Sequence, residues 1–130
     1  MRISAFRLHP GDDLRHSLEE YCRDEQIDAA VLLSSVGSLT RAVLRFAGNT
    51  SGSIIEGPLE IVSATGTLSK NGIHIHIVVS DGAGKTAGGH LLKGCIVRTT
   101  AEIVIGRLDG FVFTREKDAK TGYDELTVKG

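Results

Sequence analysis

Three histidines occur close together in this chain, and their spacing could build a metal site. His74 and His76 lie two residues apart inside a run rich in β-branched residues, from Ile73 to Ser80. If this run is a strand, both side chains share one face and lie ~6.6–7 Å apart along it. His90 follows later in the chain, directly behind two glycines. Three imidazole nitrogens with an open fourth position are typical of zinc sites that keep a place for water or substrate.

The alternation within the run predicts which way its side chains point. One face, expected to meet the core, carries Ile73, Ile75, Ile77 and Val79. His74 and His76 then share the opposite face. The segment 81–85 predicts a turn, and pairing about its centre places Thr86 opposite Ser80 and His90 opposite His76. This pairing would bring the three imidazoles onto adjacent strands. The alternative is a partly exposed sheet face that carries surface histidines, and the sequence leaves it open.

The imidazole ligands limit which metals could bind but do not determine the metal. Imidazole suits zinc, copper, iron and nickel, so the sequence predicts a divalent transition metal, with zinc as the leading candidate. Glu102 is the one catalytic candidate, either orienting a ligand histidine or acting as a base. For Glu102, the favoured interpretation is an ordinary strand carboxylate on a solvated face, without a functional role. Whether the chain is an enzyme stays undecided from its residues.

Composition bounds the function classes. The 130 residues predict one domain over 1–130, and 41% hydrophobic residues suffice for a core, built from aliphatic side chains because only 5% are aromatic. Fifteen basic against sixteen acidic residues give a net charge of −1. Direct DNA binding usually requires a basic excess or stripe, so charge gives it no support.

No apolar run resembles a signal peptide or a membrane span, which predicts a cytoplasmic protein without membrane contact. Cys22 and Cys95 are expected to be buried, reduced thiols.

Strand patterns outnumber helical ones. A helix is expected from Asp12 or Asp13, as N-cap, to about Gln26, because apolar residues recur there at helical spacing. Strands are expected over 3–8, 29–36, 40–46, 59–68, 73–80, 95–105, 111–113 and 126–128, with a break at 37–38 and a loop over 48–57. This pattern predicts an α+β domain with a mostly antiparallel or mixed sheet and one main helix. Two of these strands, 29–36 and 95–105, look apolar or neutral on both faces. One helix cannot cover that surface, so we expect subunits to associate.

Several segments in order resemble the plants and prokaryotes conserved (PPC) domain, over nearly the whole chain. The segments are Pro10–Leu14, Ser35–Leu39, Glu60–Leu68, Gly72–His76, Gly88–Leu91 and Thr99–Ile103. The resemblance implies an α+β fold that assembles as a homotrimer. It also implies an association with DNA, because in plants the domain accompanies AT-hook motifs. This chain has no Arg-Gly-Arg-Pro hook and no basic tail, so no DNA-contacting residues carry over.

The histidine pattern resembles the prokaryotic branch of this family in particular. There the resemblance implies a bound metal at positions matching His74, His76 and His90, which plant members do not generally keep. Two functions therefore compete. The first is a trimeric regulatory or assembly module, acting with DNA or a DNA-associated protein. The second is a metal-dependent enzyme or small-molecule-binding protein that uses the three histidines.

Overall fold

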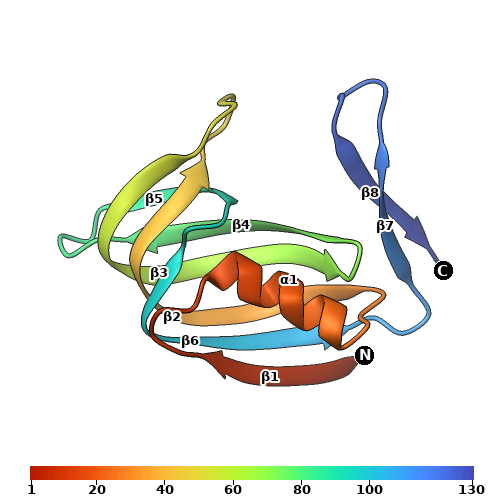
Figure 1. The fold of residues 1–130 in the computed structure, drawn as a ribbon, viewed down its shortest axis with the longest axis horizontal. Coiled ribbons are helices and arrows are strands. Elements are labelled where there is room, and N and C mark those ends of the chain that lie inside the picture. Colours follow the sequence, from red (N-terminus) through yellow and green to blue (C-terminus); the bar gives the residue numbers. More distant parts are fainter.

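One helix and eight strands make up the computed structural model, which describes all residues 1–130 (Figure 1). In chain order they are β1 (Arg2–Leu8), α1 (Leu14–Asp24), β2 (Ala30–Arg45), β3 (Ser53–Ser69), β4 (Gly72–Ser80), β5 (Thr86–Leu91), β6 (Ile96–Arg107), β7 (Val112–Lys117) and β8 (Asp124–Lys129). The first six strands form a sheet in the order β1-β6-β2-β3-β4-β5, and all its pairings are antiparallel. This confirms the predicted α+β class with one main helix.

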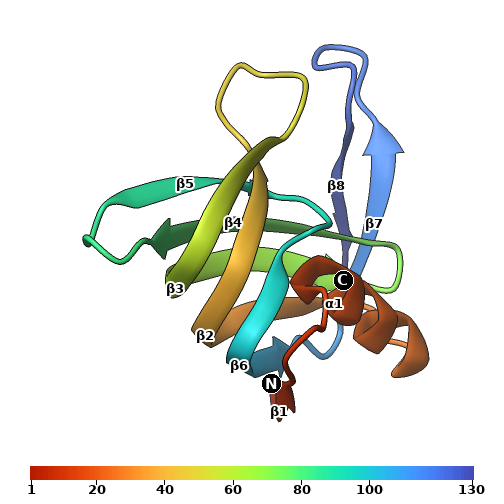
Figure 2. The ribbon, with the colours of Figure 1, turned by 60° about the vertical axis from the view of Figure 1, so that its left-hand side comes forward.

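The helix α1 covers the core side of the sheet through one apolar stripe, Leu14, Leu18 and Cys22 (Figure 2). Asp13 is its N-cap, and the carboxylate accepts a hydrogen bond from the backbone N–H of His16. The helix ends at Asp24, slightly before the predicted Gln26, because Gln26 takes a left-handed φ of 50°. At 11 residues, α1 is too short to cross a membrane.

Strand β2 is longer than the sequence predicted, and the expected break at Gly37 is wrong. The strand continues through this glycine because β6 comes unusually close there. A Cβ on Gly37 would collide with the backbone carbonyl of Thr100, so glycine permits the contact rather than ending the strand. The register of the β2–β6 ladder shifts around this point, which is how the strand bends.

The predicted loop over 48–57 is also partly wrong, because β3 begins at Ser53. Residues Arg41 to Leu44 of β2 pair with Glu56 to Ser53, so the ladder extends well into the glycine-rich stretch. The polar composition of the stretch reflects an exposed hairpin end rather than absence of strand. This β2–β3 hairpin projects above the sheet and curls toward β5 (Figure 2).

The β4–β5 hairpin has the predicted register. Thr86 pairs with Ser80 and His90 pairs with His76. The Asp81 carboxylate stabilises the turn by accepting hydrogen bonds from the backbone N–H groups of Ala83 and Lys85, both at 2.9 Å.

Strand β2 changes partner near its end. It pairs with β6 over most of its length, and then Leu44 and Arg45 pair with Leu91 and His90 of β5. Gly89 makes this contact feasible, because a Cβ there would lie 2.8 Å from the carbonyl oxygen of Arg45. The pairing places Arg45 beside the predicted metal site.

The C-terminal strands β7 and β8 form a separate hairpin at one end of the sheet (Figure 1). Its attachment uses side chains of the β3–β4 turn, since Ser69 and Asn71 both donate to the backbone carbonyl of Phe113, at 3.1 and 3.0 Å. Arg115 adds a hydrogen bond to the Thr67 hydroxyl at 3.2 Å. The hairpin is thereby held at the edge of the histidine site.

Candidate metal centre

The three predicted histidines meet at one point of the structure. Strand alternation buries Ile75 and Ile77 and sends His74 and His76 to the other face, where their Nε2 atoms lie 3.2 Å apart. His90 arrives from β5, opposite His76. One nitrogen from each ring can be chosen so that all three lie within 4.8 Å of one another. The fold therefore brings these three side chains together.

The distance between His74 and His76 suits a tetrahedral ion. Nitrogen ligands at about 2.0–2.1 Å from zinc in tetrahedral geometry lie about 3.3 Å from each other. The 3.2 Å between the His74 and His76 nitrogens is close to that value. The ring centroid of His90 lies 5.1 Å from that of His74 and 5.9 Å from that of His76, so the third imidazole borders the same space.

Electrostatics keep two of the rings neutral. Burial, together with the neighbouring Arg45 guanidinium, lowers the pKa of His90 to about 4. Burial also lowers the pKa of His74, with contributions from His76 and Arg115. A neutral imidazole has a free lone pair, so these rings are available as metal ligands at neutral pH.

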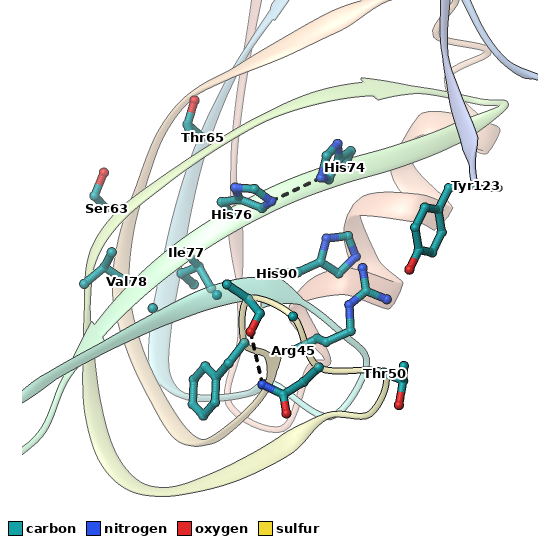
Figure 3. Close-up of a pocket in the computed structure, with 16 residues that line it drawn as sticks. Arg45, Thr50, Ser63, Thr65, His74, His76, Ile77, Val78, His90 and Tyr123 are labelled. Carbon is teal, nitrogen blue, oxygen red and sulfur yellow. Dashed lines mark hydrogen bonds between the residues drawn. The ribbon is translucent and has the colours of Figure 1, made fainter. Parts of the chain in front are cut away.

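The three rings form one wall of an open pocket of about 580 Å³ (Figure 3). Phe46 and Val78 give it apolar surface, while the β2–β3 hairpin closes one side. Tyr123, immediately before β8, reaches the pocket from the C-terminal hairpin. A volume of this size is in the range of small-molecule sites, so a bound ion would have room for a ligand at its open position.

Glu102 lies elsewhere. It is exposed on β6, opposite Arg7 of β1 and Val36 of β2, and both β2 and β3 separate it from β4. The fold therefore does not bring Glu102 to the imidazoles of its own chain. The glycine-rich segment after Asp81 is a hairpin turn, as the sequence indicated, and no helix follows it.

Sequence reasoning missed two residues of the pocket, Arg45 and Tyr123. Arg45 is brought to His90 only by the change of partner in β2, which leaves no local signal. Tyr123 belongs to a hairpin that docks through a few hydrogen bonds, from the side chains of Ser69, Asn71 and Arg115 and from the backbone N–H of Phe113. Neither placement follows from periodicity.

The chain belongs to the Plants and Prokaryotes Conserved domain family, for which both abbreviations, PCC and PPC, are used. The family's sequence profile matches residues 1–109. The match ends before β7, so the hairpin that supplies Tyr123 lies outside it.

Solved structures resemble the chain along nearly its whole length. A hypothetical protein from Salmonella enterica has 41% sequence identity and a TM-score of 0.95, with 99% of this chain and 94% of that chain covered. A metal-containing protein from Archaeoglobus fulgidus has 28% identity and a TM-score of 0.80, with 98% and 94% covered. A candidate DNA-binding protein from Ralstonia eutropha has 26% identity and a TM-score of 0.80, with 96% and 90% covered.

Among curated proteins, the chain is 42% identical over 129 residues to the bifunctional protein GlmU of a Synechococcus species. The match covers 99% of this chain and 21% of that protein. The chain therefore spans about a fifth of the length of the curated relatives it matches.

Proposed function

We propose that this PCC-domain protein holds a divalent transition metal, zinc first among them, on His74, His76 and His90, and binds a small molecule beside it. The observation that carries the proposal is the convergence of three imidazole nitrogens within 4.8 Å at a pocket wall. The metal content of the Archaeoglobus fulgidus relative adds support. A bound ion would supply positive charge and a Lewis-acidic position, and the three histidines would fix its place.

Elemental analysis tests the metal. We expect close to one equivalent of zinc or a similar ion in protein purified without chelators or affinity tags. The variant His76→Ala should lose most of this metal, because only two of the three imidazole ligands would remain. Wild-type protein without bound metal that also fails to take up added zinc would contradict the proposal.

We also propose that the chain assembles as a homotrimer. The side of the sheet opposite the core carries exposed aliphatic side chains, namely Ile3, Leu33, Val36, Val62 and Val78. Neighbouring strands bring these together, and an apolar surface of this kind is usually covered by a partner. The histidines share this side of the sheet, so their pocket would lie near a subunit boundary.

A second candidate function is a regulatory or assembly module that acts with DNA or a DNA-associated protein. The name of the Ralstonia eutropha relative favours it, while the net charge of −1 disfavours direct contact with phosphates. Gel-shift measurements at low salt, with and without cell extract, test this candidate. Absence of any shift would remove it.

We further propose that the protein is cytoplasmic, because the free, buried thiols Cys22 and Cys95 fit a reducing compartment.

A further inference from the structure

We infer that the small molecule is an organic acid, and that its anionic group binds the Arg45 guanidinium next to the metal position. The inference rests on the proposed function, because it assigns a ligand class to the same pocket. It depends on three features of the chain: the position of Arg45, the charge of the pocket wall, and the shape of the space beside it.

Arg45 is held at the site by the backbone. It pairs with His90 across the β2–β5 ladder, and direct opposition places both side chains on the same face of the sheet. The residue is half-buried and lines the pocket. Figure 3 shows its guanidinium at the pocket beside His90, with the Tyr123 hydroxyl directed toward the same side.

The guanidinium has no partner of opposite charge. Five ion pairs occur in the molecule, and none includes Arg45. Its side chain also donates no hydrogen bond to another protein group, whereas Arg15 and Arg115 nearby do. A half-buried arginine without an acceptor leaves a planar fork of N–H donors, the geometry that recognises a carboxylate or phosphate.

The pocket wall carries no negative charge. Its sixteen lining residues include one arginine and three histidines but no aspartate or glutamate. A divalent ion on neutral imidazoles would add two further positive charges. The adjoining hollow shares Arg45, His74, His90 and Tyr123, and adds the acids Asp124 and Glu125 together with Arg15 and Arg115. The side of the β2–β3 hairpin has no carboxylate, so there an anion would meet Arg45 and the ion without a competing negative charge.

The shape of this side suits a small molecule with a short body. Phe46 and Val78 offer apolar contact, and Thr50 and Thr65 add hydroxyl groups to the lining. The volume of about 580 Å³ accommodates an acid of a few carbon atoms together with a bound ion. Carboxylate and phosphate share the required chemistry, so the experiment separates them.

Cobalt-loaded protein provides the test, because Co²⁺ in a histidine site reports ligand exchange through its visible absorption. Bound cobalt is first counted by elemental analysis after dialysis. The protein is then titrated with malonate, with methylphosphonate and with neutral malonamide, and cobalt retention is checked after each titration. We compare wild-type protein with Arg45→Gln and Arg45→Lys. Arg98→Gln serves as the matched control, since Arg98 is exposed on β6 and lines none of the pockets around the histidines.

We expect at least one of the two anions to change the cobalt spectrum saturably, while malonamide does not. Arg45→Gln should weaken this binding about tenfold to a hundredfold at unchanged cobalt content, the loss of a charge-assisted hydrogen bond. Arg45→Lys should recover part of it, and Arg98→Gln should bind as the wild type does. A response to malonate alone identifies a carboxylate ligand, and a response to methylphosphonate alone identifies a phosphate ligand.

Two results would overturn the inference while leaving the metal site intact. One is full cobalt loading with no response to either anion. The other is equal anion affinity in wild-type protein and Arg45→Gln. Failure of wild-type protein to bind cobalt would instead contradict the proposed function, and the inference with it.

Discussion

Replacing His90 by glutamine tests whether the two strands β4 and β5 share one metal ion. His74 and His76 come from the same strand, and their nitrogens are already 3.2 Å apart. His90 is the one candidate ligand from β5, and it depends on the hairpin register. The variant therefore removes one ligand of three and leaves the other two in place.

The expected loss of zinc affinity in His90→Gln follows from the number of ligands. Structural zinc sites with four protein ligands bind with about 10–16 kcal/mol, which averages about 3 kcal/mol for each ligand. Loss of one ligand of that strength corresponds to a dissociation constant raised about a hundredfold or more. A hydrogen bond made by His90 without coordination of the ion would contribute far less to metal affinity.

Competition with a chromophoric chelator measures the dissociation constant for zinc at pH 7. His9→Gln is the matched control, because His9 is exposed and does not belong to the histidine cluster. We expect wild-type affinity in the control and the hundredfold loss in His90→Gln. Equal affinity in the two variants would refute the three-ligand geometry. Circular dichroism of the metal-free proteins verifies that both variants fold.

Three further outcomes are expected. Gly89→Ala should lower the free energy of unfolding by about 1–3 kcal/mol, because its Cβ would lie 2.8 Å from the Arg45 carbonyl oxygen; urea titration against Gly82→Ala, where a Cβ meets nothing within 4 Å, checks this, and equal midpoints would argue against it. Metal-free protein should lose stability as the pH falls from 6.5 to about 4, because His90 takes up its proton near 6.5 when unfolded and only near 4 when folded; urea midpoints across this range should fall less in His90→Gln, and parallel curves would contradict the lowered pKa. Val36→Glu, on the exposed aliphatic face, should break up the proposed trimer, so that light scattering gives the mass of smaller species than for the wild type, and an unchanged mass would remove this face from the interface.

The histidine site was predictable because it depends on local rules. Alternation along β4 fixes the shared face of His74 and His76. A short turn after Ser80 fixes the register of β5, so His90 lies opposite His76. No long-range information is needed for this step.

The rest of the pocket depends on long-range pairing. Arg45 reaches His90 only because β2 pairs with β6 over most of its length and with β5 near its end. No residue pattern in β2 predicts this change of pairing partner. Gly37 was misinterpreted for the same reason. From the sequence alone, a glycine that permits a close approach of β6 cannot be distinguished from one that ends a strand. Tyr123 depends on how the C-terminal hairpin docks onto the β3–β4 turn.

Crystallographic anomalous scattering at a metal absorption edge tests the central claim most directly. Data from crystals of protein purified without chelators should show one strong peak about 2.0–2.1 Å from a nitrogen of each of His74, His76 and His90. A water or small anion should complete the coordination on the side of Arg45. Crystals soaked in zinc that show no peak among these three rings, or a peak bound by only one of them, would contradict the account.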